Sequence, residues 1–171
     1  ELSLGSSIAK ADSVVYDFMV SNPQADIVAW VNPTSPFQSK DEINSIVNYF
    51  IDNNLDSLIT VENKYVHCYF NEGPVNFNKN SLFAQTQDLD PVQPFVYSMM
   101  VWNSKKFIAE FRQNGSAFFC GNFDVYPVSK LTGIIIKTEE DLKVADLLMQ
   151  SLSVNHSNYK VQYDDIVTNS K

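Results

Sequence analysis

Hydrophobic residues in this chain occur in runs of two kinds, which predict alternating helices and strands. Between residues 7 and 22 apolar side chains recur at helical spacing, and Pro23 ends this pattern. Residues 27–31 form an unbroken apolar run, which favours a strand buried on both faces, as at the centre of a parallel sheet. Residues 43–51 carry an apolar helical face that begins after Ser39 or Asp41, and residues 57–61 predict the next strand. This order is typical of an α/β layer.

The middle of the chain has a weaker pattern. Residues 65–70 alternate only partly between apolar and polar, which favours a short strand, and residues 71–74 are typical of a turn. Residues 75–94 show no stable period, so we expect a long excursion of the kind that serves function or builds an interface. The strongly apolar residues 95–102 predict a strand.

The second half of the chain returns to regular patterns. A helix is predicted from Asn103 or Ser104 to the Asn-Gly pair at residues 114–115, followed by strands within residues 118–126 and at residues 133–136. Thr138 and Asp141 have the spacing of a capping box, so a last helix is expected there. Its predicted buried stripe consists of Leu142, Ala145, Leu148, Met149 and Leu152. Residues 153–171 form a polar tail with a weak strand signal at residues 161–167.

The turn after residues 27–31 is the first candidate site. Pro33 and Pro36 stop the strand, and Thr34 and Ser35 place two hydroxyl groups between them. Ligands of open α/β sheets collect at the carboxyl ends of strands. The alternative interpretation is a rigid polar turn without a ligand.

Composition narrows the class of protein. A net charge of -8 and a pI near 4.6 repel a nucleic-acid backbone, so we expect no nucleic-acid partner. No apolar run approaches the ~20 residues of a membrane helix, so no membrane partner is expected. The two cysteines, Cys68 and Cys120, are too few for a disulfide framework and suit a cytoplasmic protein. His67 and His156 lack the spacing of a metal pair.

Several stretches, taken in order, resemble the acylneuraminate cytidylyltransferase family, which includes the CMP-sialic acid synthetases. Residues 32–37, Asn-Pro-Thr-Ser-Pro-Phe, are similar to its Pro-Thr-Ser-Pro loop, and residues 86–91, Thr-Gln-Asp-Leu-Asp-Pro, are similar to its Gln-x-Leu-Pro loop. Residues 56–58, 73–77 and 138–142 resemble further segments. Residues 1–2 and the helix after them resemble the start of the family's second α/β unit, so the resemblance covers residues 1–152.

The resemblance implies an α/β fold of the Rossmann-like, three-layer nucleotidyltransferase type (nucleotide-diphospho-sugar transferase), with a mixed, mostly parallel sheet. It also implies transfer of CMP from CTP to an acidic, sialic-acid-type sugar, with Mg²⁺ as the family's cofactor. The implied substrate-binding residues are Asn32, Thr34, Ser35, Gln38 and Gln87. A homodimer is implied, with residues 75–102 as its candidate segment, in a domain spanning residues 1–152 ahead of the 153–171 tail.

Several departures from the family pattern argue against a catalytically active chain. The opening strand and the Gly- and Lys-containing loop of the family precede Glu1, so we expect the N-terminal unit to be missing from this chain. The family's metal-binding Ile-Asp-Ile-Asp-Thr reads Ile-Ile-Ile-Lys-Thr at residues 134–138. Ile135 and Lys137 supply no oxygen ligand, so we expect that this chain binds no Mg²⁺. The family's Asn-Gly pair falls near Val96 and Tyr97, and its arginine after the Pro-Thr-Ser-Pro loop is Gln38.

Three hypotheses remain open at this point. The chain is a cytidylyltransferase whose nucleotide loop lies outside it, or an inactive homologue that serves as a binding or assembly subunit. The third hypothesis is an unrelated α/β domain with coincidental motifs. No nucleophile triad or zinc spacing is present in the sequence to suggest another enzyme class.

Overall fold

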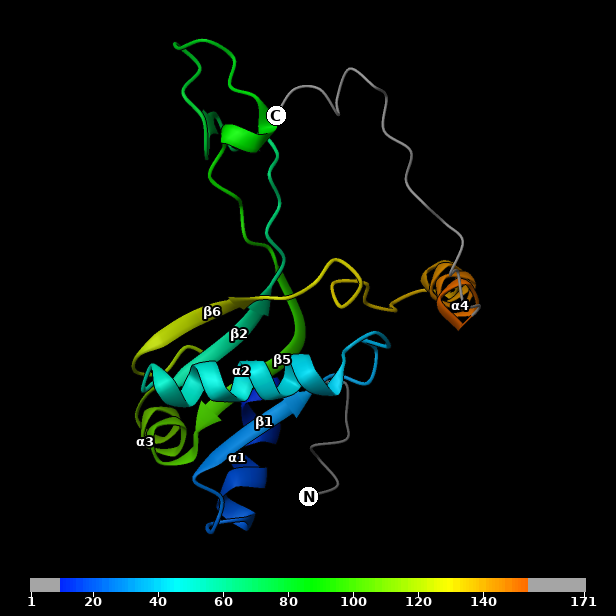
Figure 1. The fold of residues 1–171 in the computed structure, drawn as a ribbon. Helices are drawn as coiled ribbons and strands as arrows, with labels where there is room; N and C mark the ends of the chain where they lie inside the picture. Colours follow the sequence, from blue (N-terminus) through cyan, green and yellow to red (C-terminus); the bar gives the residue numbers. More distant parts are fainter. Residues whose placement is uncertain (1–9, 154–171) are drawn as a thin grey trace. The chain divides into compact units, whose positions relative to one another are not determined.

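The computed structural model describes residues 10–153 and divides into two compact units, with the boundary between Ile135 and Ile136. The first unit contains a sheet with helices on both faces (Figure 1). Its elements in chain order are α1 (Ala11–Ser21), β1 (Ile27–Val31), α2 (Lys40–Asp52), β2 (Ser57–Val61), β3 (Tyr69–Phe70), β4 (Gly73–Pro74), the 3-10 turn η2 (Thr86–Asp88), β5 (Phe95–Asn103), α3 (Ser104–Asn114) and β6 (Phe123–Pro127). The second unit contains α4 (Glu139–Ser153). None of the helices within residues 10–153 is long and apolar enough to cross a membrane.

The main sheet has the strand order β1-β5-β2-β6. β5 is antiparallel to both β1 and β2, whereas β6 is parallel to β2, so β1, β2 and β6 point in one direction and β5 in the other. The α/β class and the mixed sheet with mostly parallel strand directions are therefore confirmed. The sequence had placed no strand between β1 and β2, and β5 occupies that position.

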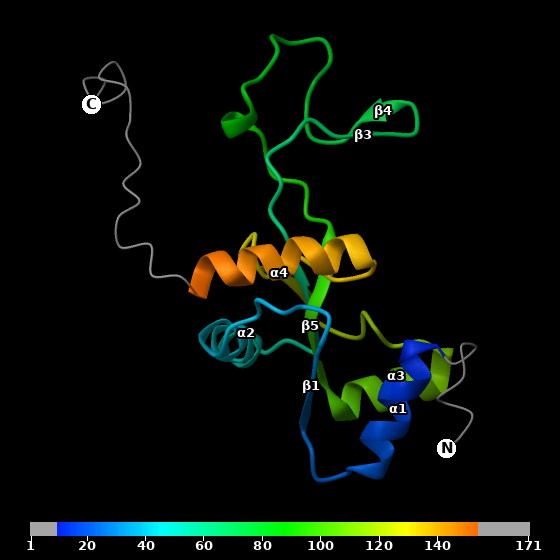
Figure 2. The same ribbon diagram turned by 90° about the vertical axis from the view of Figure 1, so that its right-hand side faces the viewer.

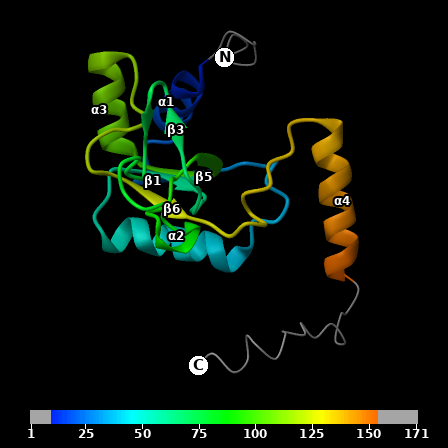
Figure 3. The same ribbon diagram turned by 90° about the horizontal axis from the view of Figure 1, so that it is seen from above.

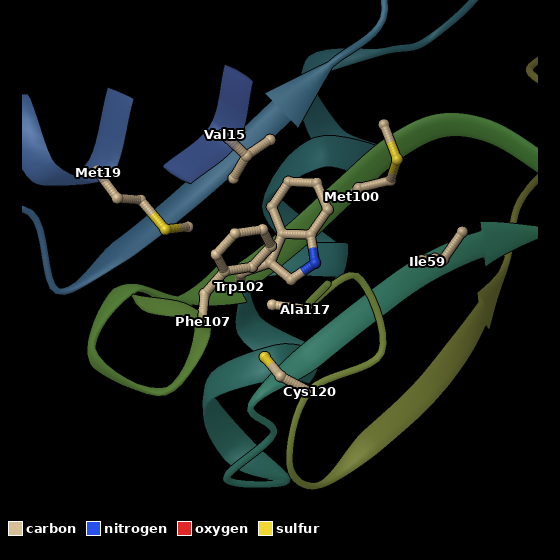
Figure 4. Close-up of a cluster of buried hydrophobic side chains, with 8 residues drawn as sticks. All are labelled: Val15, Met19, Ile59, Met100, Trp102, Phe107, Ala117 and Cys120. Carbon is tan, nitrogen blue, oxygen red and sulfur yellow. The ribbon is translucent and has the colours of Figure 1, made fainter. Parts of the chain in front are cut away.

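Two layers of helices cover this sheet, which gives the expected three-layer arrangement (Figure 3). On one face, Val15 and Met19 of α1 and Phe107 of α3 pack against Met100 and Trp102 of β5 (Figure 4). On the other face, α2 packs through Ile46 and Phe50 against Leu58, Met99 and Val101. Successive residues of β5 thus serve opposite faces, as the two-residue period of a strand requires.

The prediction for residues 27–31 was wrong in one respect. β1 is at the edge of the sheet described here, and Ile27 and Val31 are 39% and 42% exposed. The nine-residue strand β5 pairs with a neighbour on each side and takes the central position together with β2, every residue of which is buried. An unbroken apolar run indicates a strand but does not identify its neighbours.

Two further expectations are corrected by the structure. Residues 133–136 do not form a strand, because Gly133 N donates to Ser129 O at 2.9 Å and Ile134 N to Leu131 O at 3.0 Å, which continues a turn. In α4, Ala145 is buried but Leu142, Met149 and Leu152 are exposed. The described part of the second unit has no other helix or strand to cover that stripe.

Helix ends follow the local chemistry of the sequence. Ser39 accepts a hydrogen bond from Glu42 N at 3.1 Å, and Asn103 accepts one from Lys106 N at 3.2 Å. Thr138 and Asp141 form the reciprocal bonds of the predicted capping box, from Asp141 N to Thr138 Oγ1 at 3.2 Å and from Thr138 N to Asp141 Oδ2 at 2.8 Å. These bonds hold the pKa of Asp141 below its usual range, chiefly through the backbone N–H of Lys137.

The long excursion between β2 and β5 extends from one end of the sheet (Figures 1 and 2). It contains the β3-β4 hairpin and η2, with an isolated bridge between Lys64 and Val92 at its base. The side chain of Asn76 holds it together, because it accepts from Cys68 N and donates to the carbonyl oxygens of Val66 and Asp90. The weak strand signal at residues 65–70 is therefore realised only as Tyr69–Phe70. The strand signal at residues 161–167 lies outside the described residues.

Candidate functional site

The loop that follows β1 is held rigidly by its own first residue. Asn32 Oδ1 accepts hydrogen bonds from Thr34 N at 3.1 Å and Thr34 Oγ1 at 2.9 Å, and Asn32 O accepts one from Ser35 N. Asn32 N donates to Ser98 O at 2.9 Å, which ties the loop to β5. An Asx turn that contains Pro33 and is followed by Pro36 loses little further freedom when a ligand binds. This loop is therefore preorganised at the carboxyl end of β1.

A cavity of about 480 Å³ lies inside the excursion, and a larger one of about 640 Å³ lies beside the β1 loop. Aromatic side chains dominate the walls of the larger cavity, and Asp12 of α1 and Asn32 are its polar members. The aromatic members are Trp30, Tyr97, Phe118 and Phe119. A volume in this range and a mainly apolar wall with few polar groups are typical of small-molecule sites. We call this space the β1 cavity.

Its side chains come from α1, where Asp12 lies, and from three further segments that are distant in the sequence. Trp30 and Asn32 belong to the end of β1, Tyr97 to the start of β5, and Phe119 to the loop after α3. Ala117 N donates to Asp12 Oδ1 at 2.7 Å, so α1 positions that loop. The antiparallel direction of β5 brings its first residues to the same end of the sheet as the last residues of β1. The cavity thus depends on β5, whose position in the sheet could not be predicted from the sequence.

Two predicted site residues, Ser35 and Gln38, instead form hydrogen bonds that hold the loop to other segments. The hydroxyl of Ser35 is buried and donates to Thr132 O at 2.9 Å. Gln38 Nε2 donates to Glu42 Oε2 at 2.9 Å, and the same oxygen accepts from Thr132 Oγ1 at 2.6 Å. Glu42 Oε1 accepts from Ser129 N at 2.9 Å. This network joins the β1 loop to the start of α2 and to the turn after β6.

The structure brings together only part of the predicted set. Asn32 lines the β1 cavity, Thr34 is exposed and outside its wall, and Ser35 and Gln38 belong to the supporting network. Gln87 is exposed in η2, where its amide nitrogen faces Gln85 Oε1, and the excursion that carries it lies apart from β1 (Figures 1 and 2).

Sequence reasoning missed the aromatic walls. Trp30, Tyr97 and Phe119 have the side chains of core residues, so composition alone assigns them to the interior. One signal was available for Trp30, since it is two residues before Asn32 and therefore on the same face of an extended strand.

Ionisable chemistry is sparse at this end of the sheet. The walls of the β1 cavity include no Lys, Arg or His. Within residues 10–153 no group of three or more His, Cys, Asp or Glu side chains is arranged to hold a metal ion. Burial raises the pKa of the Cys120 thiol to about 11, with a smaller contribution from Asp56, so this thiol stays protonated and is a poor nucleophile.

The smaller cavity in the excursion contains His67. Its ring stacks on Phe83 at a centroid distance of 4.3 Å and meets Phe77 edge-on at 5.0 Å. These contacts are those of a packed histidine. His156 lies outside the described residues.

Comparison with known proteins adds the fold to this picture. No protein-family model matches the sequence, and no curated protein matches it. Among solved structures, the chain is similar to the cytidylyltransferase 4-diphosphocytidyl-2C-methyl-D-erythritol synthase from Anaerococcus prevotii, with a TM-score of 0.56 and 15% sequence identity. The match covers 83% of this chain and 67% of that one. At this identity the likeness concerns the fold, and the chain accordingly has a Rossmann-like nucleotidyltransferase fold.

Proposed function

We propose that the protein is cytidylyltransferase-like and acts in the activation of an acidic, sialic-acid-type sugar, with the β1 cavity as its binding site for the CMP-sugar. The observation that carries the proposal is the position of the Asn32 loop. Asn32 and Pro33, at the start of a rigid turn, line a ligand-sized cavity at the carboxyl end of a strand, in a sheet of nucleotidyltransferase type.

The chemistry of transfer sets a requirement that this cavity does not meet alone. A sugar hydroxyl attacks the α-phosphate of CTP and pyrophosphate leaves, so negative charge must be neutralised as the bond forms and breaks. Asp12 and Asn32 are the polar wall residues, and neither carries positive charge. These side chains can orient hydroxyl groups but cannot stabilise a triphosphate. We therefore propose that this chain by itself binds ligand without catalysing transfer.

The side chains of residues 134–137, where the resemblance would place the metal site, argue against binding of Mg²⁺ there. Hard divalent cations need oxygen ligands, whereas residues 134–137 are Ile-Ile-Ile-Lys. Lys137 would repel a cation in that position. The residues present do not fit the metal, and no catalytic step is derived through it.

Tryptophan fluorescence tests the proposal directly. Trp30 is half-buried in the cavity wall whereas Trp102 is fully buried in the core, so a ligand in the cavity should change chiefly the Trp30 signal. We expect saturable quenching by CMP-N-acetylneuraminic acid, and its loss in Trp30→Phe with binding retained in calorimetry. With CTP, N-acetylneuraminic acid and Mg²⁺ we expect no pyrophosphate release. Absence of calorimetric binding would refute the binding site, and steady pyrophosphate release would refute the inactive state.

A second candidate function, an assembly subunit, is favoured by the surface of the excursion. Tyr69, Phe70, Leu82 and Phe83 are 61%, 71%, 95% and 83% exposed, a density of large apolar side chains that is uncommon on a free monomer. We propose that this surface joins two copies of the chain as a homodimer.

Sedimentation velocity tests the dimer. The wild-type chain should sediment as a dimer at micromolar concentration, and Leu82→Lys with Phe70→Glu should sediment as a monomer. Ile51→Lys is the matched control, because Ile51 is an exposed apolar residue of α2, outside the excursion, at 50% exposure. A wild-type monomer, or dissociation by the control alone, would contradict the proposed interface.

A further inference from the structure

Tyr97 has an unusual backbone for its residue type. Its φ is +54°, in the left-handed region that favours glycine, and aromatic residues rarely adopt it. Such a conformation persists only where the surroundings enforce it, and it is concentrated at sites that bind or react. The same residue lines the β1 cavity, with its side chain 42% exposed.

The surroundings that enforce it form a bulge in β5. Between the pairs Ile59–Met100 and Val61–Phe95, β2 advances by two residues while β5 advances by five. A bulge bends its strand and redirects a side chain that a regular ladder would have placed elsewhere. Here the redirected residues include Tyr97.

Thr60 fixes this bulge from inside the sheet. Its Oγ1 accepts from Met99 N at 3.1 Å and lies 3.0 Å from both Met99 O and Ser98 Oγ. On the other side, Ser98 O accepts from Asn32 N at 2.9 Å. The bulge is thus bonded to both neighbouring strands, and the Asn32 loop and Tyr97 are held by adjacent residues of one unit.

The result is a cavity with aromatic faces and hydroxyl-binding groups. The Tyr97 ring packs beside Phe95 with a centroid distance of 5.6 Å, and Trp30 and Phe119 contribute further aromatic wall. Asp12 can accept a hydrogen bond from a hydroxyl group through Oδ2, since its Oδ1 already accepts from Ala117 N. Asn32 Oδ1 already accepts two bonds from Thr34, so Asn32 can serve a hydroxyl group only as a donor, through its amide N–H groups. A carboxylate or phosphate would meet the charge of Asp12 with no Lys, Arg or His in the wall to offset it.

We propose that Tyr97 is a specificity-determining residue of the β1 cavity, and that its ring stacks on an uncharged, hydroxyl-bearing sugar ring. This inference rests on the proposed function and refines it. The cavity recognises the neutral face of the sugar, while the acidic group of the sugar and the phosphate of the CMP-sugar point out of the cavity. The left-handed backbone is retained because it delivers the ring.

Three variants separate a ligand contact from a structural role. Tyr97→Gly suits the left-handed backbone and removes the ring, whereas Tyr97→Phe keeps the ring and removes the hydroxyl. Tyr65→Gly is the matched control, because Tyr65 is an exposed tyrosine of the excursion, outside both cavities, at 49% exposure. Each is titrated with CMP-N-acetylneuraminic acid, N-acetylneuraminic acid and the methyl ester of that acid, and each is melted by circular dichroism.

We expect Tyr97→Gly to lower the affinity for the ligand while leaving the thermal stability almost unchanged. Tyr97→Gly should lose at least tenfold in affinity for the methyl ester while its melting temperature stays within about 3 °C of the wild type, because relief of strain offsets the loss of the ring. Tyr97→Phe and Tyr65→Gly should bind within threefold of the wild type. The methyl ester should bind at least as tightly as the free acid.

Each contrary result has its own meaning. If the wild type binds the CMP-sugar and Tyr97→Gly binds it equally well, the role of Tyr97 is overturned while the proposed function stands. If the methyl ester binds in a Tyr97-dependent way but the CMP-sugar does not bind, the proposed function fails and the stacking role stands. A tenfold preference for the free acid overturns the neutral-ring assignment, and absence of all binding overturns both.

Discussion

Replacing Gly121 with alanine should destabilise the fold far more than the same change at Gly115. Both glycines have a left-handed backbone, with φ of +59° and +72°. A Cβ at Gly115 would meet nothing within 4 Å, whereas a Cβ at Gly121 would lie 2.2 Å from Asp56 Oδ2 and 2.6 Å from Asp56 Cβ. Alanine must therefore displace Asp56 in one case and only strain its own backbone in the other.

The structure allows the two costs to be compared. An alanine in the left-handed region costs about 1 kcal/mol, which is the whole expected effect of Gly115→Ala. Displacing Asp56 also breaks the 2.9 Å bond from Asn122 N to Asp56 Oδ2, a solvent-exposed bond to a carboxylate worth about 1–2 kcal/mol. Gly121→Ala should therefore cost roughly 2–4 kcal/mol, or about 5–15 °C in melting temperature for a chain of this size.

Urea unfolding followed by tryptophan fluorescence and far-ultraviolet circular dichroism measures both free energies. A double-mutant cycle supplies the control, because Asp56→Gly removes the side chain that the new methyl group would strike. In that background Gly121→Ala should cost only about 1 kcal/mol, like Gly115→Ala. Equal costs for the two alanines in the wild-type background would refute the steric argument. Phe118 and Phe119 precede Gly121 in the same loop, so Gly121→Ala should also weaken ligand binding in the β1 cavity.

Two further outcomes are expected. Thr60→Val should lower the free energy of unfolding by about 1–3 kcal/mol, because it leaves the buried Met99 N without its acceptor. Thr60→Ser should recover most of this loss. Equal unfolding midpoints in urea for the wild type and Thr60→Val would contradict the prediction. The pKa of Asp141 is lower in the folded helix than in the unfolded chain. The stability that this cap contributes to α4 is therefore present above the pKa of Asp141 in the unfolded chain. It is lost as the pH falls through the pKa of Asp141 in the folded chain, below about pH 4. An NMR titration of the Asp141 carboxyl checks this: its midpoint should be lower in the folded chain than in the urea-unfolded chain, and Thr138→Ala should raise it only in part, because the bond from Lys137 N remains. Equal midpoints in the folded and unfolded chain would refute the cap as the cause.

Local features of the fold were predictable because they depend on neighbouring residues. The Ser39 cap, the Thr138–Asp141 capping box and the end of α3 at Gly115 are each set by side chains within four positions. Sheet order was not predictable in this way. The reversed strand β5 lies between β1 and β2 in space although it follows both in the chain, and no local pattern encodes such a pairing.

For the site, too, features set by neighbouring residues were predicted and features set by distant residues were not. The turn itself was identified from two prolines and two hydroxyl residues within four positions, and Asn32 was added through the resemblance of residues 32–37 to the family's loop. The supporting role of Ser35 was not, since its partner Thr132 is 97 residues away. The aromatic wall was missed for a related reason: whether Tyr97 or Phe119 is core or cavity depends on which segments fold beside it.

Tyr97 has a backbone that a smaller residue would adopt at lower cost. The Asn-Gly pair of the family falls near residues 96–97, and glycine is the residue expected where a backbone is left-handed. The structure places φ at +54° on Tyr97. A site that had only lost its function would gain stability from glycine or asparagine at residue 97, because either relieves the strain. Here a tyrosine occupies this strained position, in a bulge fixed by Thr60 and Ser98, and it lines the β1 cavity, as the proposed ligand contact requires.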